Sequence, residues 1–351
     1  MSSSDTRAVT AFRRQAEICA SLGSPMYGDL IGALADDLAG GGPTKDVLGP
    51  LADDGAAPPV LLALRLVGGL HRLVLDDEVP ALAASYPSVG GVWDRDVAWP
   101  HVRAALVEHR ERLHASLDHP LQTNEVGRSA ALAGGVLRVA DRFALPVRLI
   151  EIGASAGLNL RVDHYRFGSP SGWWGPVDSR VAMRGAWKGL SPPVDAPLEI
   201  VERTGFDLTP LDIGQADDRR VLEAYTWPDM TERLSRLRAA TTIAQEVPVR
   251  LEQRSAADGL DALELVDGTA TVVWHSITWP YLDDDEQRRI VERLDALGAT
   301  ADVDRVLAHV RLEPADVLAG PYPVILTTWP FGEATEIGSA PPHGLPVTWT
   351  A

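Results

Sequence analysis

The chain has 351 residues, of which 45% are hydrophobic and 23% charged, a composition typical of globular proteins and unlike that of disordered or fibrous chains. At roughly 150 residues per domain, this length predicts about two domains. The 32 basic and 49 acidic residues give a net charge of -17. Such a surface repels polyanions, so we expect neither nucleic acid nor a membrane surface as a partner.

Cysteine usage and the N-terminal sequence indicate a protein of a reducing compartment. Cys19 is the only cysteine, which excludes an intrachain disulfide and a cysteine-based zinc site. The sequence MSSSDTRAVTAFRRQAEICA lacks an apolar signal core, and the longest apolar runs fall far short of the ~20 residues that span a bilayer. We therefore expect a cytoplasmic protein, whose oligomeric state the sequence leaves open.

Apolar residues recur at helical spacing through the N-terminal part of the chain, with little strand alternation. The spacing predicts helices over residues 6–22, 26–38, 59–75, 94–117 and 124–143. Asp94 and Asn124 are candidate N-caps of the last two, and the Gly- and Pro-rich residues 40–59 read as a loop-rich spacer. Residues 1–145 are thus predicted to form an all-helical region, which could serve as a lid or as the substrate side of a site.

At Pro146 the pattern changes, because VRLIEIG is a short apolar run that ends in glycine, as a buried parallel strand does. Further strand candidates are LEIVERTGFD, VPVRLEQ, ATVVWHSI, VLAHVRLE, VILTTW and LPVTWT, with helices between them that include 217–246 and 284–297. Strands that alternate with helices predict an α/β domain over residues 146–351. Residues 161–197 lack periodicity and are predicted to be an insertion.

The segment LIEIGASAGLNL (149–160) carries the strongest local signal for a ligand site. A strand ends at Gly153, and small residues then lead into a predicted helix, where exposed N–H groups favour an anionic or polar ligand. One interpretation is a hydrolase, because GASAG (153–157) matches the GxSxG turn that presents a nucleophile, here Ser155. Its triad would draw on Asp258 or Asp283 and on His309 or His343. The helical character of the preceding residues argues against it.

The same segment matches the cofactor loop of S-adenosylmethionine-dependent methyltransferases, in which a strand ends in an acidic residue followed by glycine and small residues. In this interpretation Glu151 accepts a hydrogen bond from the cofactor's amino group, and the backbone of Gly153, Ala154, Ser155 and Gly157 runs beside it. Asp207, at the end of the next strand in GFDLTPLD, would bind both ribose hydroxyls. The alternative is structural, with glycines for tight packing and Asp207 opening a turn with Thr209.

Five segments resemble the bacterial DUF2332 family, and together they extend over nearly the whole chain: LQTNEVGRSAAL (121–132), LIEIGASAGLNLRVDHYRF (149–167), GFDLTPLDI (205–213), VVWHSITWPYL (272–282) and LTTWPFGEATEIGSAPPHGLPVTW (326–349). The resemblance implies a methyltransferase-like Rossmann sheet behind a helical N-terminal region, but it transfers no activity. Where related sequences have a Gly-Asp pair after the third strand, this chain has LEQRSAADGL, so Ser255 or Asp258 would contact the adenine end. The short segment 313–322 predicts an altered order of the last strands, since a parallel crossover needs more residues.

Other polar residues extend the candidate site. His275 ends an apolar strand, where ligands of open α/β sheets gather, and could act as a general base with Tyr281 orienting a small-molecule substrate. The alternative is an inert His275 bonded to a neighbouring loop. Asn124, Glu125 and Arg128 would form a lid or an interdomain contact over the site, or a structural cap. We expect no metal site. A fold that binds a ligand or partner without catalysis is the third alternative.

Overall fold

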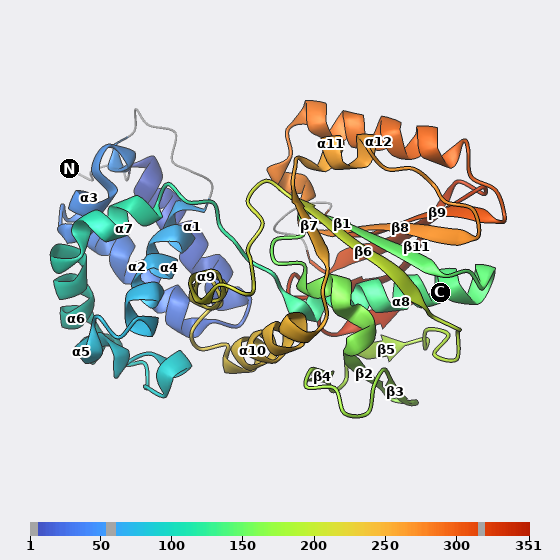
Figure 1. Ribbon diagram of the computed structural model, residues 1–351. Helices are drawn as coiled ribbons and strands as arrows, with labels where there is room; N and C mark the ends of the chain where they lie inside the picture. Colours follow the sequence, from blue (N-terminus) through green and yellow to red (C-terminus); the bar gives the residue numbers. More distant parts are fainter. Residues whose placement is uncertain (1–5, 54–60, 315–319) are drawn as a thin grey trace. The chain divides into compact units, whose positions relative to one another are not determined.

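The computed structural model describes residues 6–53, 61–314 and 320–351, and the chain divides into two compact units (Figure 1). Unit 1 comprises residues 1–123 and 215–235, and unit 2 comprises residues 124–214 and 236–351. This division differs from a boundary at residue 145 in two ways. The helix before residue 145 packs with unit 2, and a later segment of the chain returns to unit 1.

Unit 1 is built from helices around one apolar core. Its elements are α1 (Arg7–Ser21), α2 (Pro25–Ala39), α3 (Pro43–Leu48), η1 (Gly49–Ala52), α4 (Leu62–Leu75), α5 (Pro80–Ala83), η2 (Pro87–Val89), α6 (Arg95–Glu108), α7 (Arg110–Ser116), α9 (Ala216–Ala224) and the start of α10 (Thr231–Glu246). Helices α1 and α2 approach closely at Gly28, where a Cβ would lie 2.8 Å from the Cβ of Ala20. Phe12, Leu70 and Trp227 belong to the core.

The predicted helices of this unit are confirmed with changed boundaries. Residues 94–117 form two helices, α6 and α7, which meet at His109, and Asp94 caps α6 by accepting from the N–H groups of Asp96 and Val97. The spacer prediction for 40–59 is wrong in part, because α3 and η1 form within it. Residues 54–60 lie outside the described residues, so the predicted start of the 59–75 helix does too.

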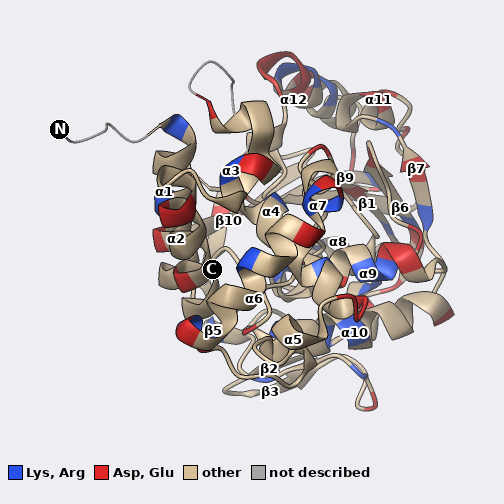
Figure 2. Ribbon diagram, turned by 90° about the vertical axis from the view of Figure 1, so that its left-hand side faces the viewer, with Lys and Arg blue, Asp and Glu red and all other residues tan. Residues whose placement is uncertain are grey.

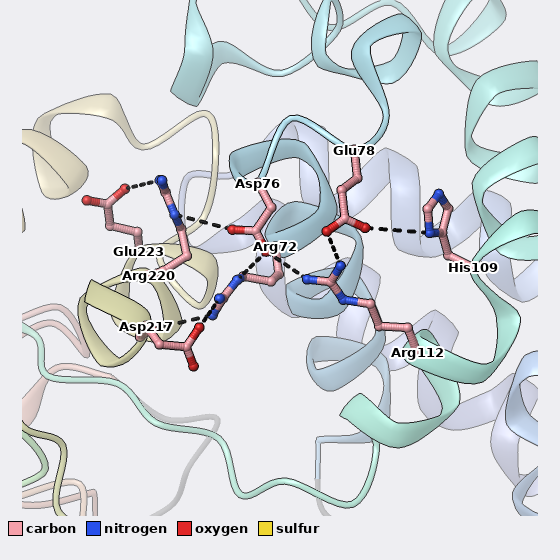
Figure 3. A network of polar contacts seen from close by, with 8 residues as sticks. All are labelled: Arg72, Asp76, Glu78, His109, Arg112, Asp217, Arg220 and Glu223. Carbon is pink, nitrogen blue, oxygen red and sulfur yellow. Dashed lines mark hydrogen bonds and ion pairs between the residues drawn. The ribbon is translucent and has the colours of Figure 1, made fainter. Parts of the chain in front are cut away.

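Within unit 1, a network of ion pairs joins residues 215–235 to the N-terminal helices (Figure 3). Asp76, at the end of α4, accepts from Nε of Arg72 at 2.7 Å, from a terminal nitrogen of Arg112 at 2.7 Å and from Nε of Arg220 at 3.4 Å. Arg72 also pairs with Asp217 of α9. The carboxylate of Asp76 is 19% exposed, so this hub is partly shielded from solvent.

Asp76→Asn is therefore expected to lower the free energy of unfolding of unit 1 by about 2 kcal/mol, because three guanidinium groups lose their shared anion. Urea denaturation of the variant measures this loss. Asp36→Asn is the control, since Asp36 also faces two arginines but is 64% exposed. Its expected effect is below about 0.5 kcal/mol. Equal effects of the two substitutions would contradict the hub role of Asp76.

Unit 2 contains a mixed sheet of nine strands in the order β5-β12-β11-β10-β9-β8-β1-β6-β7. These strands are β1 (Val147–Ile152), β5 (Trp187–Gly189), β6 (Ile200–Asp207), β7 (Arg250–Gln253), β8 (Thr269–Ser276), β9 (Arg305–Leu312), β10 (Tyr322–Trp329), β11 (Glu333–Ala340) and β12 (Val347–Trp349). The run β7-β6-β1-β8-β9 is parallel, and β10 to β12 pair in antiparallel fashion. The α/β class and the altered order of the last strands are thus confirmed.

Helices cover both faces of this sheet (Figure 1). Helix α8 (Ser129–Phe143) packs against β8, β9 and β10, while α11 (Ala256–Asp261) and α12 (Asp284–Gly298) lie on the opposite face. Apolar residues of α12, such as Ile290 and Leu294, pack into a core with Ile150 and Phe206 of the strands. Acidic side chains gather in the first turn of α12, where they suit the helix dipole (Figure 2).

Three sequence predictions for residues 146–351 need correction. Residues 217–246 form two helices, α9 and α10, rather than one, since Pro228 falls between them. Strand β11 was not predicted. The insertion at 161–197 holds η4 (Leu158–His164) at its start and a small sheet of β2 (Arg166–Ser169), β3 (Gly172–Trp174) and β4 (Ala182–Met183), but its β5 joins the edge of the main sheet beside β12. No helix of the described residues could cross a membrane.

Candidate functional site

The candidate site lies at the carboxyl edge of the parallel strands. The chain runs from β1 outward to β6 and β7, then crosses back to β8 and β9 on the other side of β1. In open α/β sheets, ligands bind outside the carboxyl ends of the strands at such a reversal point. The strand order therefore places the predicted residues that follow β1, β6, β7 and β8 along one edge.

The glycine loop after β1 is shaped by left-handed residues, because Gly153, Ser155 and Gly157 have φ values of 67°, 51° and 65°. Its main-chain donors are engaged within the protein. The N–H groups of Gly153 and Ala154 donate to the carbonyl of Phe206 at 2.9 and 3.1 Å. The N–H groups were expected to be free at the start of the following helix, but there the N–H of Leu158 donates to Oδ1 of Asn124. A ligand at Gly153, which is exposed, would meet main-chain surface.

Glu151 lies beneath this loop in an almost fully buried position, with an exposure of 2%. Its Oε1 accepts from Nε1 of Trp274 at 3.2 Å and from Nδ2 of Asn159 at 3.4 Å. Its Oε2 and the Oδ1 of Asn159 are buried without a hydrogen-bond partner among the described residues. Burial, which outweighs these two hydrogen bonds, raises the pKa of Glu151 to about 8. The site thus holds two buried oxygen atoms without a partner in the protein, and below pH ~8 the proton of Glu151 belongs on Oε2, because Oε1 already accepts both bonds.

Asp207 lies beside the glycine loop at the end of β6, half-buried. Its Oδ2 accepts from the N–H of Ser155 at 2.8 Å, and its Oδ1 accepts from the N–H of Thr209 at 2.9 Å. The turn with Thr209, predicted as the structural alternative, is therefore formed. Each carboxylate oxygen offers a second lone pair, so these two bonds leave acceptor capacity for a ligand.

The residues proposed for the adenine end serve helix ends in this structure. Ser255 caps α11 by accepting from the N–H of Asp258 at 3.1 Å. The carboxylate of Asp258 pairs with Arg289 at 2.7 Å, and this hydrogen bond lowers the pKa of Asp258. Both residues follow β7 at the carboxyl edge, where contact with an adenine stays a prediction.

His275 is fully buried, and both of its ring nitrogens are engaged. Nδ1 lies 2.7 Å from Oε1 of Glu313, and Nε2 lies 2.9 Å from Nε2 of His309. To act as a general base, His275 would have to give up one of these bonds, so the geometry matches the alternative of an internally bonded histidine. Tyr281, by contrast, is 58% exposed after β8, and its role toward a substrate stays a prediction.

The segment Asn124–Arg128 reaches the site from the start of unit 2. Asn124 is not the N-cap of α8, which begins at Ser129; instead, its Oδ1 accepts from the N–H of Leu158 at 2.8 Å. The carboxylate of Glu125 accepts from the N–H of Gly127. Arg128 donates to the carbonyl groups of Pro342 and Ser276 at 3.0 and 3.3 Å. This segment therefore braces the glycine loop and the end of β8.

Sequence reasoning missed four residues that complete this edge: Asn159, Trp274, Thr278 and Glu313. Asn159 and Trp274 hold Glu151, and Glu313 holds the loop after β8. Position alone could have indicated Glu313, because it directly follows the last residue of β9. Several residues of the hydrolase alternative have other partners, since Asp283 caps α12 and His309 bonds to His275. No metal-binding group of His, Cys, Asp and Glu occurs within the described residues.

A comparison with protein families identifies the family of this chain. Residues 9–349 match the family described as "Uncharacterized protein conserved in bacteria (DUF2332)". None of the curated proteins matches the chain. The match extends over nearly the whole chain, so the chain belongs to the DUF2332 family.

Proposed function

We propose that unit 2 binds S-adenosylmethionine at the carboxyl edge of β1 and β6 and transfers its methyl group to a small molecule. One observation carries the proposal. Two carboxyl groups lie at the carboxyl ends of the neighbouring strands β1 and β6, beside the reversal point of the sheet. Glu151 is buried and has an oxygen without a partner, and Asp207 is half-buried. The parallel order, with β1 central and its chain neighbours to one side, supports the proposal because nucleotide-like ligands bind at this place in Rossmann-type sheets.

The residues present fit this cofactor in hydrogen-bonding capacity, and also in charge once Glu151 has lost its proton. The unused Oε2 of Glu151 and Oδ1 of Asn159 would accept from its ammonium group, and the spare lone pairs of Asp207 would accept from the two ribose hydroxyls. When bound, the cofactor supplies an electrophilic methyl group. The chain's own contribution is to hold and orient it, with Tyr281 exposed at the same edge to orient an acceptor.

Calorimetric titration with S-adenosylmethionine and S-adenosylhomocysteine tests the proposal, and binding of both is the expected result. Two other outcomes support the alternatives. Labelling of Ser155 by a fluorophosphonate, without cofactor binding, would favour the hydrolase. The φ of 51° at Ser155 is compatible with this alternative, because a nucleophile of the GxSxG type lies on a strained turn. Cofactor binding without turnover of any acceptor would favour a ligand-binding fold that lacks catalysis.

Asp207→Ala is expected to weaken binding of S-adenosylhomocysteine by about 2 kcal/mol, since charge-assisted bonds to the ribose are lost. Titration calorimetry measures the change in Kd. Asp212→Ala is the matched control, because Asp212 forms the same kind of turn two residues before Gly214 without following a strand. An affinity that falls equally in both variants would remove Asp207 from the site.

A further inference from the structure

Glu313 is the acidic residue that follows β9, and its carboxylate joins the last two parallel strands at the carboxyl edge. Oε1 lies 2.7 Å from Nδ1 of His275 and accepts from the N–H of Thr278 at 2.9 Å, while Oε2 accepts from the N–H of Trp279 at 3.3 Å. The side chain is 10% exposed. Because a carboxylate only accepts, Nδ1 of His275 carries the hydrogen of the first bond.

The bond between the two histidines then has a defined direction. Two ring nitrogens 2.9 Å apart share a single hydrogen, and in the Nδ1–H tautomer of His275 the Nε2 atom offers only a lone pair. Nε2 of His309 is therefore the donor. Burial, together with the neighbouring His275 and Arg311, lowers the pKa of His309 well below its ordinary value. The resulting chain of donors runs from His309 through His275 to Glu313.

The loop that Glu313 holds forms one wall of the candidate site. Ile277 has a φ of 51°, a strained value for a β-branched residue, and Trp279 stacks on the ring of His275 with centroids 5.4 Å apart. Thr278 lies directly over Gly153, where a Cβ would be 2.5 Å from its Oγ1. The two backbone bonds to Glu313 thus keep a strained loop pressed against the glycine loop.

We propose that Glu313 is a positioning residue of this site, which fixes loop 277–279 against Gly153 through its bonds to the amides of Thr278 and Trp279, while His275, backed by His309, holds its carboxylate. The effect expected on cofactor affinity rests on the proposed function. The effects on hydrogen-bond direction and on loop order do not, so they are measured separately.

The first test uses the wild-type protein and records long-range ¹⁵N–¹H correlations of the histidine rings at pH 7. The expected spectrum shows a hydrogen on Nδ1 of His275 and a hydrogen on Nε2 of His309. His275 protonated only on Nε2 would overturn the inference. This measurement needs neither a variant nor a ligand.

The second test is hydrogen exchange of the Thr278 and Trp279 amides in Glu313→Gln. Glutamine has one acceptor oxygen, so it cannot accept all three bonds, and exchange is expected to speed up by about tenfold or more. Glu202→Gln is the control, because Glu202 also has hydrogen-bond partners on the sheet but contacts Arg148 and Thr204 instead of this loop. Exchange in Glu313→Gln that stays within about twofold of the control would contradict the positioning role.

Cofactor titration of the same variants separates the two proposals. If wild type binds S-adenosylhomocysteine, Glu313→Gln is expected to bind it on the order of tenfold more weakly, with Glu202→Gln unchanged. If wild type does not bind, the proposed function fails, and the histidine spectra and amide exchange still decide the role of Glu313.

Discussion

Gly344→Ala is expected to destabilise unit 2 by about 3 kcal/mol, one of the largest effects of a single methyl group in this chain. Gly344 has a φ of 81°, and a Cβ there would lie 2.4 Å from the backbone nitrogen of Arg128 and 2.5 Å from the carbonyl carbon of Gly127. Backbone atoms cannot rotate away as a flexible side chain can. Gly127 is equally close to the segment that contains Gly344, because a Cβ at Gly127 would lie 2.5 Å from the carbonyl oxygen of His343.

Gly332→Ala separates the two causes of this loss. Gly332 has a similar φ of 72°, but its nearest neighbour is a side-chain atom of Trp329 at 3.8 Å, so only the backbone conformation opposes the new methyl group. The expected loss is about 1 kcal/mol, and urea denaturation measures both variants. Losses that agree within error would show that residues 127 and 344 do not pack as closely as the structure has them.

This contact also explains why two glycines of the sequence segments could not be interpreted before the structure was known. Gly127 and Gly344 are 217 positions apart, and neither NEVGR nor PPHGLP contains a local signal that they meet. Arg128 makes the same point, since it bonds to Pro342 and Ser276. Contacts of this kind depend on the packing of separate elements, which periodicity does not encode.

Features that one segment encodes could be predicted. Glu151, the glycine loop and Asp207 follow apolar strands directly, and parallel strands end at the same edge, so their proximity followed from local pattern. Strand β11 was missed because its residues Glu333–Glu336 are all exposed and mostly polar, which removes the apolar alternation. The apolar face of α8 predicted a helix, but it could not indicate that the helix packs on the sheet.

Glu151→Gln is expected to stabilise unit 2 at alkaline pH while weakening the cofactor site. Burial raises the pKa of Glu151 from an ordinary 4.5 to about 8. Between these values the folded state keeps a proton that the unfolded chain releases, so stability falls as pH rises through this window and levels off above pH ~8. The pKa difference corresponds to at most about 5 kcal/mol, and glutamine, which has no such proton, avoids that loss.

Urea denaturation at pH 5, 7 and 9 tests the stability effect. Wild type and variant are expected to have similar free energies of unfolding at pH 5, and the variant is expected to be clearly more stable at pH 9. Glu202→Gln is the control of opposite sign. Although burial of Glu202 acts to raise its pKa, Arg148 outweighs burial and lowers it, so this substitution loses stability at neutral pH. An advantage of Glu151→Gln that does not grow with pH would show that Glu151 is ionised in the folded protein.

Cofactor titration completes this test, because a proton and the cofactor's ammonium group would compete for the same buried oxygen of Glu151. Wild-type affinity is therefore expected to rise with pH up to about pH 8. In Glu151→Gln, the amide oxygen keeps the bonds from Trp274 and Asn159, so the NH₂ group faces the ligand. Affinity for the cofactor is then expected to fall on the order of tenfold and to lose its pH dependence. An increase in stability together with unchanged affinity would mean that Glu151 only fills the core beneath the glycine loop, and the cofactor assignment would then depend on Asp207 alone.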